Sequence, residues 1–566
     1  WLSDSVTVRQ KTQLPALSFI GVGARAFQRF EADDNVNQGA DHVAFKLEGT
    51  GEALVISTPS AVLINSAQFG PQQLGVSQGR LPDGIGPITM FRGSASPGAA
   101  NFLLLQQIVV NEVLTHTDAP LMDAVEFYNT TADGVDISGW FLSDSGVNLR
   151  KFEIPPNTIV PPNGYLVLYE NQFNSDLASD RFSFSSANGD EVFLSQANNS
   201  VLTGYRATAS FGAAENGVSF GRFPTSQGYH FVPMAQRTFG RDNPTSTNDF
   251  ALGKGAANSY AKVGPIVISE IMYHPGVGAD TFEYVELHNI ASTNVPLYDL
   301  ANPANPWRTR KGADFEFATG TTIAPGGYLV LVNFDPDADA LSRAAFEDAY
   351  QTTTATLVGP FRGALDNGGE AVELQKPDAP QLDGSVPYIM VDRVDYDDTL
   401  PWPLAADGAG NSLNKLNVTL YGNDPTNWFA AVPSPGQAPI PDRDHDGLPD
   451  QYEIDNGLNP DLAADAVADK DGDGIINRDE YFNGTNPQDP SDPLVIQSAT
   501  AAATGLTLRF GVAAGKTYSV LYSDNSPLGP WIKLRDVTAA TTGFVQINDT
   551  PPVKVRFYRL VTPALP

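Results

Sequence analysis

The sequence contains no cysteine and little positive charge, and both absences exclude classes of function. Without cysteine there is no disulfide framework, no thiolate nucleophile and no cysteine-ligated zinc site. Only 34 lysine and arginine residues stand against 65 aspartate and glutamate residues, which gives a formal net charge of −31. Proteins that bind nucleic acid need a basic face, so we expect no nucleic-acid partner. The acidity instead favours solubility and divalent cations.

Long apolar runs are also missing. No stretch approaches the roughly 18 apolar residues of a membrane span, and the first residues lack the charged-then-apolar pattern of a signal peptide. The sequence opens at Trp1 without a methionine, so we expect the chain to be processed or to be a piece of something longer. With 566 residues it is too long for one ordinary core, and it should form several domains.

Most of the chain shows a sequence pattern typical of short strands joined by turns. Short runs of Val, Ile, Leu, Phe and Tyr alternate with polar residues and are bounded by Gly, Pro, Asn or Asp, as at 108–113, 164–169 and 191–194. Helical periodicity is confined to two short stretches, near 340–350 and 449–483. The sequence therefore predicts an all-β protein.

Internal repeats organise the first three quarters of the chain. The segment from Trp1 to Ser5 recurs at Trp140 to Ser145, and the segment 75–82 recurs at 217–224 with nearly the same offset. A third copy follows. Its segments 266–271, 284–289 and 324–331 answer 108–113, 124–129 and 161–168 of the second copy.

The repeated motifs are a strand ending in Asn/Ser-Glu, then Val-Glu-(Phe/Leu)-x-Asn, then Ser-Gly-Trp, then Gly-Tyr-Leu-Val-Leu. They resemble the lamin tail domain, found in nuclear lamins and in large secreted bacterial proteins. The resemblance implies immunoglobulin-like β-sandwiches. The third copy departs at Ser-Gly-Trp, where 295–300 stands instead and Trp307 follows late.

The repeats set the expected domain boundaries. We predict a partial lamin tail domain at 1–100 and complete ones at 101–258 and 259–438. The first copy begins at its tryptophan and lacks the strands that precede Trp140 in the second copy. Truncation is the simpler explanation. Donation of the missing strands by a neighbouring chain is the alternative.

The segment 439–493 carries the strongest chemical signal. Two loops place oxygen ligands at positions 1, 3, 5, 9 and 12, with glycine at position 6, which is the spacing that wraps six to eight oxygens around a hard cation. Residue 7 lends its carbonyl, and Glu at position 12 closes the cage. We therefore predict two Ca²⁺ sites. The ligands are Asp442, Asp444, Asp446, the Leu448 carbonyl, Asp450 and Glu453 in the first loop, and Asp469, Asp471, Asp473, the Ile475 carbonyl, Asn477 and Glu480 in the second.

This segment resembles the calcium linkers of thrombospondin type 3 repeats and dockerins. The resemblance implies a brace that stiffens when calcium neutralises its carboxylates. The last module, 494–566, shows the alternation of a small C-terminal β-sandwich. The predicted fold class is thus all-β: tandem immunoglobulin-like β-sandwiches, a short Asp-rich calcium-binding segment and a C-terminal β-sandwich.

Three tempting motifs do not indicate catalysis. The segments 75–79 and 217–221 fit Gly-x-Ser-x-Gly, but a nucleophile elbow joins a strand to a helix, and these lie late in β-sandwich repeats. Six dispersed histidines lack zinc-site spacing. Glu112, Glu126, Glu270 and Glu286 recur at matching positions, which favours a structural role shared by the repeats. We predict no catalytic residues and no organic cofactor, so the chain is not expected to be an enzyme.

Two classes of function remain open. The first is an extracellular or cell-surface scaffold or adhesive protein of a bacterial matrix, filament or surface layer, with a calcium-rigidified linker. Its partners would be proteins, through self-association or neighbouring surface proteins, with carbohydrate as the alternative. The second is a non-catalytic accessory region of a larger secreted enzyme, of the nuclease or spore-coat-kinase-like kind.

Overall fold

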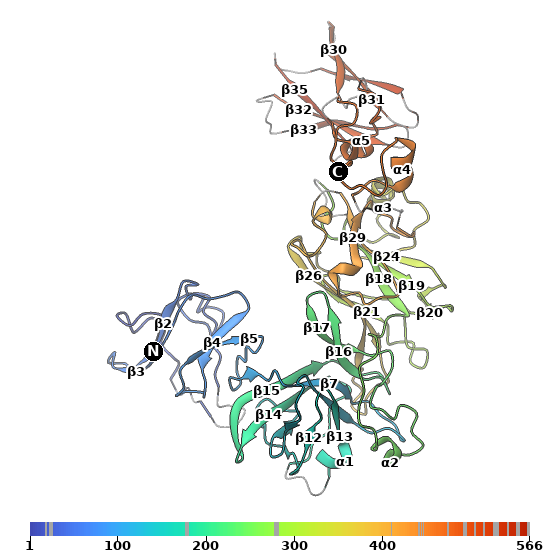
Figure 1. Ribbon diagram of the computed structural model, residues 1–566. Helices are drawn as coiled ribbons and strands as arrows, with labels where there is room; N and C mark the ends of the chain where they lie inside the picture. The colour runs from blue at the N-terminus through green and yellow to red at the C-terminus, as the bar shows by residue number, and fades with distance from the viewer. Residues whose placement is uncertain are drawn as a thin grey trace. The chain divides into compact units, whose positions relative to one another are not determined.

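The computed structural model describes residues 1–566 except 17, 19, 22–26, 176–179, 277–281, 409, 440, 441, 443, 445, 473, 474, 491–494, 503, 504, 513–515, 525–530, 540, 542, 551–554 and 563–566. The chain divides into two compact units, Trp1–Lys262 and Val263–Pro566. Strands dominate both units and helices are few and short, which confirms the predicted all-β class (Figure 1). Within the described residues, no helix has the length and apolar character to cross a membrane.

The second repeat is a sandwich of two five-stranded sheets. One has the order β13-β8-β7-β16-β17 and the other β11-β10-β14-β15-β6. The strands of the first sheet are β7 (Ile108–Leu114), β8 (Ala124–Asn129), β13 (Tyr165–Tyr169), β16 (Phe220–Thr225) and β17 (Gly228–Pro233). Those of the second are β6 (Leu103–Leu104), β10 (Phe141–Ser143), β11 (Phe152–Glu153), β14 (Asp190–Asn198) and β15 (Val201–Phe211). A separate ribbon pairs β9 (Val135–Asp136) with β12 (Ile159–Val160).

The third repeat, in the other unit, has the same central strand order, with one strand added at the edge of its first sheet and no counterpart of β6 in its second. Its sheets have the orders β25-β24-β19-β18-β28-β29 and β22-β21-β26-β27. The strands of the first sheet are β18 (Ile266–Met272), β19 (Tyr284–Asn289), β24 (Tyr328–Val332), β25 (Leu357–Val358), β28 (Ser412–Lys415) and β29 (Trp428–Ala431). Those of the second are β21 (Arg308–Lys311), β22 (Phe315–Glu316), β26 (Gly369–Pro377) and β27 (Tyr388–Asp397). The ribbon is made by β20 (Val295–Pro296) and β23 (Thr322–Ile323).

Both sandwiches bury a core between their sheets. Trp140 fills that of the second repeat, and Trp307, Trp402 and Trp428 lie in that of the third. These tryptophans are 3–6 % exposed, so they pack the core and do not present a platform for sugars.

A second apolar layer covers the outer face of the β7 and β18 sheets. In the second repeat it contains Phe239 and Phe250, the latter from α2 (Thr247–Phe250). In the third repeat it contains Phe346 of α3 (Ala340–Ala349), where helical periodicity predicted a helix. The repeats are therefore three-layered, and the third layer comes from loops and from chain that follows the last strand.

A buried asparagine closes the end of each central strand pair. The Asn129 Nδ2 donates to the carbonyls of Asp133, Val160 and Pro161 at 2.7, 3.1 and 2.9 Å. Asn289 does the same at the equivalent place in the third repeat, donating to the Thr293, Ile323 and Ala324 carbonyls. This explains why the Val-Glu-x-x-Asn motif ends in asparagine: a single amide satisfies several carbonyls of an irregular turn.

The first hundred residues form two small sheets. Strands β1 (Leu2–Ser3), β2 (Glu52–Ser57) and β3 (Leu63–Phe69) make one, and β4 (Val76–Arg80) and β5 (Ile88–Arg92) make the other. By sequence, β4 corresponds to β16, which pairs with β7 in the second repeat. Among the described residues β4 has only β5 as a sheet neighbour. The partial domain and the two explanations for it stay predictions.

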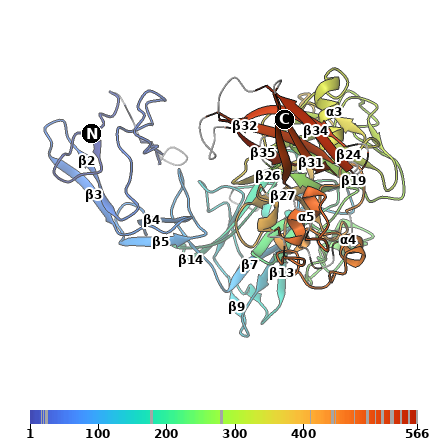
Figure 2. The same cartoon turned by 90° about the horizontal axis from the view of Figure 1, so that it is seen from above.

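The last module contains two three-stranded antiparallel sheets around Leu508, Phe510, Tyr518 and Val520. Their orders are β30-β31-β34 and β33-β32-β35. The strands are β30 (Ile496–Ala502), β31 (Gly505–Val512), β32 (Thr517–Ser523), β33 (Ile532–Thr538), β34 (Gly543–Asp549) and β35 (Phe557–Val561). Two short helices precede them, α4 (Asp450–Asp455) and α5 (Asn477–Asn483), and both views of the chain place these helices close together (Figures 1 and 2).

Candidate metal centre

The first acidic loop is folded by its own carboxylates. The two oxygens of Asp442 accept from the backbone N–H groups of Asp446 and Gly447 at 3.2 and 2.9 Å. Asp446 Oδ1 then accepts from the Leu448 N–H at 2.8 Å. Gly447 has φ 92°, a left-handed conformation that favours glycine and explains its place at position 6 of the loop. The tight coil is followed by α4, which carries Glu453.

Five carboxylates converge at this loop. One oxygen each of Asp442, Asp444 and Asp446 lie within 4.8 Å of one another, and the same is true of Asp446, Glu453 and Asp465. Asp446 belongs to both groups, so the five side chains form one cluster. Glu453 is 0 % exposed and Asp446 is 7 % exposed. This is an oxygen-only donor set of the kind Ca²⁺ prefers.

Several of these oxygens are buried with no partner among the described residues. They are both oxygens of Asp444, both oxygens of Glu453, Oδ2 of Asp446 and Oδ1 of Asp465. An unsatisfied buried acceptor costs about 1–3 kcal/mol, and a charged one costs more. Burial, and then the neighbouring carboxylates, raise the pKa of Asp446 to about 7 and that of Glu453 to about 8. A bound cation would remove both costs, so the residues present fit a calcium ion.

The carboxylate cluster differs from the predicted ligand set by two residues: it includes Asp465 and does not include Asp450. Asp465 lies outside both loops, and a spacing rule confined to twelve consecutive residues gives no signal for it. Its Oδ2 accepts from the Asn459 N–H at 2.7 Å, which holds the side chain in place. Asp450, predicted at position 9, begins α4 and is not in either converging group. An EF-hand residue at this position often binds its ion through water.

The second loop is described in part. Asp473 lies outside the described residues. Asp469 Oδ1 accepts from the Gly472 N–H at 2.7 Å, and Gly472 has φ 83°. Glu480 and Asn477 are both 0 % exposed and both belong to α5. Asp471 and Ile475 are half-buried. The predicted ligand set of this loop therefore stays a prediction.

Contacts tie the two loops and the last module together. The rings of Tyr452 in α4 and Tyr481 in α5 have centroids 4.7 Å apart. The Lys516 ammonium donates to the Tyr481 carbonyl at 3.2 Å, and Lys516 belongs to the last module. The acidic segment thus has a defined connection to the module that follows it.

Paired glutamates form a second set of buried acids. Glu112 and Glu126 face each other across β7 and β8, and Glu270 and Glu286 face each other across β18 and β19. All four are 0–1 % exposed. Both repeats therefore place a pair of carboxyl groups at the same position in the sandwich. The hydrogen bonds of each pair show which segments it binds.

In the second repeat the pair binds the chain that follows β17. Glu112 accepts from the Thr238 N–H at 3.1 Å and from the Thr238 hydroxyl at 2.6 Å. Glu126 accepts from Asn111 Nδ2 at 2.6 Å and from the Ala256 N–H at 3.2 Å. Burial raises the pKa of Glu112 to about 7 and that of Glu126 to about 9.

The third repeat repeats this contact. Glu270 accepts from the Ser434 N–H at 3.0 Å and from the Tyr284 hydroxyl at 2.6 Å, and Glu286 accepts from the Gly436 N–H at 2.7 Å. Burial raises the pKa of both, and the Glu270 charge raises that of Glu286 further. These oxygens are committed to hydrogen bonds within the protein, from backbone N–H groups and from side chains, which supports the structural role predicted for them.

The Gly-x-Ser-x-Gly motif of the second repeat serves the same network. Ser219 is 0 % exposed, and its hydroxyl donates to Glu112. It precedes β16, an antiparallel strand that turns into β17 and not into a helix. Ser412 donates to Glu270 in the third repeat. The serine is therefore placed as a partner of a buried acid.

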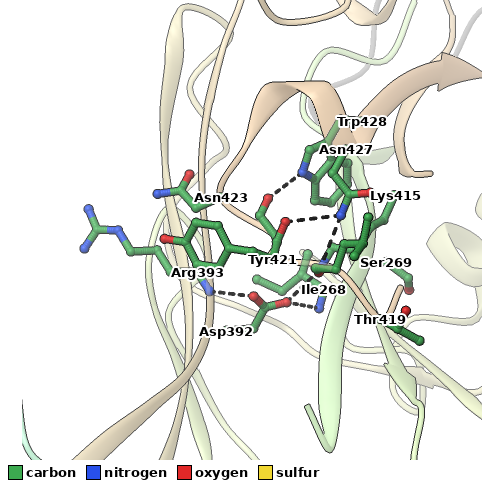
Figure 3. Close-up of polar contacts among 12 residues, drawn as sticks. Ile268, Ser269, Asp392, Arg393, Lys415, Thr419, Tyr421, Asn423, Asn427 and Trp428 are labelled. Carbon is green, nitrogen blue, oxygen red and sulfur yellow. Dashed lines mark hydrogen bonds and ion pairs between the residues drawn. The ribbon is translucent and has the colours of Figure 1, made fainter. Parts of the chain in front are cut away.

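A buried ion pair joins the two sheets of the third repeat (Figure 3). Lys415 Nζ lies 2.8 Å from Asp392 Oδ2, and their side chains are 0 % and 7 % exposed. Asp392 also accepts from the N–H groups of Ile268 and Arg393 at 2.9 and 3.0 Å. The Lys415 ammonium lies 5.5 Å from the centre of the Trp428 ring. The charges satisfy each other, so this cluster is a structural tie.

Comparison with protein families gives a match to the lamin tail domain over residues 105–209 and 259–397. These regions fall in the two repeats whose sandwiches are complete, and the match supports tandem lamin tail domains with an immunoglobulin-like fold. No match was found among curated proteins or among solved structures. The acidic segment and the last module lie outside the matched regions.

Proposed function

We propose that this chain, which carries two tandem lamin tail domains, is an extracellular scaffold or adhesive protein whose acidic segment is stiffened by calcium. The lamin tail domain is an immunoglobulin-like structural or interaction module. The observation that carries the proposal is the cluster of buried carboxylate oxygens without partners at Asp444, Asp446, Glu453 and Asp465. Without a cation, such a cluster costs folding free energy, because its buried oxygens lack partners. A bound cation would remove that cost and link the segments that carry the ligands.

Calcium fits the cluster better than magnesium. Magnesium demands a near-ideal octahedron with bonds of about 2.0–2.1 Å, whereas calcium accepts six to eight oxygens in a flexible shell. The cluster offers five carboxylates from a loop, a helix and a linker, with the Leu448 carbonyl as a further candidate. Extracellular calcium modules bind with dissociation constants of about 10⁻⁴–10⁻³ M, so millimolar calcium outside cells would keep such a site filled.

The ion would act on stiffness. Without it, five buried or half-buried carboxylates repel one another, which weakens the contact between α4 and the loop. With it, the loop, α4 and the linker that carries Asp465 share one centre. A ligand that binds only the folded state stabilises it in proportion to RT ln(1 + [L]/Kd). The sandwiches need no metal for their cores, so the effect should be local.

Limited proteolysis with elemental analysis tests the metal part. The calcium-loaded chain should contain calcium and resist cleavage around 440–490, and chelation should open that segment while both sandwiches stay intact. Asp446→Asn should behave like the chelated protein, because Asp446 belongs to both converging groups. Asp479→Asn is the matched control, since Asp479 is an exposed carboxylate of α5. Identical cleavage with and without chelator, together with no bound calcium, would refute the metal site.

The scaffold part has its own test. Negative-stain electron microscopy and sedimentation of the full chain in millimolar calcium should show self-association into regular assemblies, or co-assembly with a neighbouring surface protein. Isolated particles that bind no partner protein under these conditions would contradict it. The two tests are separate, because a calcium joint can exist in a protein that does not assemble.

A further inference from the structure

We infer that the two acidic loops bind their ions cooperatively, because Asp465 is a ligand of the first ion while its backbone is held by the second loop. The inference rests on the proposed calcium function and adds a rule for how the sites fill. It follows from contacts of Asp465, Asn477 and Lys470, of which only Asn477 belongs to a predicted ligand set.

The Asp465 side chain is aimed at the first loop. Its Oδ1 is buried without a hydrogen-bond partner and lies in the converging group with Asp446 and Glu453. Its Oδ2 is fixed by the Asn459 N–H at 2.7 Å. One oxygen therefore holds the carboxylate in position and the other is presented to the cluster, as in a ligand oriented by a partner behind it.

The Asp465 backbone rests on the second loop. The Asn477 Nδ2 donates to the Asp465 carbonyl at 2.7 Å. The next bonds continue the contact: Arg478 N–H donates to the Ala466 carbonyl at 3.0 Å and Asn477 N–H to the Ala468 carbonyl at 2.8 Å. The linker thus lies along the first turn of α5, which carries the predicted second-loop ligands Asn477 and Glu480.

A reverse contact runs from the second loop to α4. Asn477 Oδ1 accepts from the Lys470 N–H at 3.1 Å, so the same amide organises the second loop. Lys470 Nζ donates to the carbonyls of Asn456 and Gly457, at the end of α4, at 2.5 and 2.8 Å. The helix that carries Glu453 is therefore also held from the second loop.

These contacts explain how one filled loop can favour the other. Filling the second loop orders α5 and the Lys470 turn, which places Asp465 and Glu453 for the first ion before that ion arrives. Coupling of binding free energies is reciprocal, so the first ion must favour the second equally. We expect each filled loop to raise the affinity of the other by about tenfold, within the usual range of such effects.

Calcium titration of the metal-stripped full chain by calorimetry tests this. The wild type should bind two ions with a Hill coefficient above 1. Asp465→Asn should weaken the first site by about tenfold or more and leave the second loop able to bind. Asn477→Asp keeps a side-chain oxygen but removes the amide donor, and the first loop already has an acid, Asp450, at the corresponding position. It should bind two ions independently, with a Hill coefficient near 1.

Lys470→Met provides a second variant that removes no predicted ligand, and it should also lower the Hill coefficient. Asp479→Asn, an exposed change on α5, should titrate like the wild type. Two ions bound independently by the wild type would overturn the coupling. So would cooperative binding that persists in both Asn477→Asp and Lys470→Met, and wild-type affinity in Asp465→Asn would remove that residue from the ligand set. A wild type that binds no calcium would instead refute the proposed function.

Discussion

The paired glutamates of the two sandwiches occupy equivalent strand positions and are held by side chains that differ in part. Tyr284 on β19 donates to Glu270 at 2.6 Å, whereas its counterpart on β8 is Ala124, which has no donor. Thr238 gives Glu112 both its N–H and its hydroxyl. The two repeats share two kinds of donor: a serine hydroxyl, from Ser219 or Ser412, and backbone N–H groups from the chain after the last strand. The other side-chain donors differ and adjust the strength of this clamp.

The two repeats also differ at a pair of equivalent cationic residues, Arg222 on β16 and Lys415 on β28. Lys415 is 0 % exposed and paired with Asp392, whereas Arg222 lies half-buried over the Tyr229 ring, 3.4 Å from its centre. One repeat uses its cation to tie two sheets, and the other leaves it near the surface. Equivalent positions in one fold therefore carry very different energetic consequences.

Removing the buried cation should break the comparison most strongly. Lys415→Met leaves the Asp392 carboxylate buried without its charge partner, which should cost about 3–5 kcal/mol. Arg222→Met should cost less than about 1 kcal/mol, because it loses a surface cation–π contact. Hydrogen exchange followed by mass spectrometry, read on β26 and β27 for the first variant and on β14 and β15 for the second, separates the two. Equal loss of protection would contradict the distinction.

Deleting one glutamate from each pair sharpens the comparison. Glu270→Ala leaves the Tyr284 hydroxyl, the Ser412 hydroxyl and the Ser434 N–H without their acceptor, and should cost about 3 kcal/mol. Glu112→Ala should cost somewhat less, because no buried phenol is left behind. Denaturant unfolding followed by exchange in each sandwich gives both values. A larger effect in the second repeat would show that the phenol does not matter.

The pH dependence of the second sandwich follows from its raised pKa values. A carboxyl with a higher pKa in the folded than in the unfolded chain stabilises the fold most at low pH, and this contribution is lost as the pH rises through the folded pKa. The window for Glu126 runs from its ordinary 4.5 to about 9. Glu126→Gln should flatten the decline between pH 5 and 9, by up to about 1.4 kcal/mol per pH unit. Parallel stability profiles for variant and wild type would refute this titration.

The smallest effect is expected from the phenol itself. Tyr284→Phe keeps the ring that packs beside Phe346 and removes only the hydroxyl that donates to Glu270. It should destabilise the third sandwich by about 1 kcal/mol and bring it closer to the second. The second sandwich serves as the internal reference, because Ala124 stands at the equivalent position and has no side-chain donor. An unchanged midpoint would assign the stabilisation of Glu270 to its other donors, the Ser412 hydroxyl and the Ser434 N–H.

Much of the fold was accessible from the sequence because its cues are local or repeated. Alternation located the long strands, periodicity located the helix now described as Ala340–Ala349, and the repeats located Glu112 and Glu270 as equivalents. The same motif marks Asn129 and Asn289 as equivalents, although neither their burial nor their carbonyl partners could be read from it.

The remaining features depend on contacts between distant segments. Asp465 joins the first loop from outside its spacing, and only the folded linker brings it there. Lys415 and Asp392 lie on different sheets, so no periodicity connects them. The residues that donate to the glutamates, such as Thr238 and Gly436, lie in segments without a strand pattern. No sequence pattern there indicates which residue will reach the buried acids.

The clamp by the paired glutamates has a practical consequence for dividing this chain into fragments. The regions that match the lamin tail domain end at 209 and 397, before the residues that the glutamates bind. A piece cut at those ends would leave two adjacent acids exposed on an uncovered sheet. A fragment meant to fold alone should instead run to 258 or to 438, so that Ala256 or Gly436 is retained with its partner.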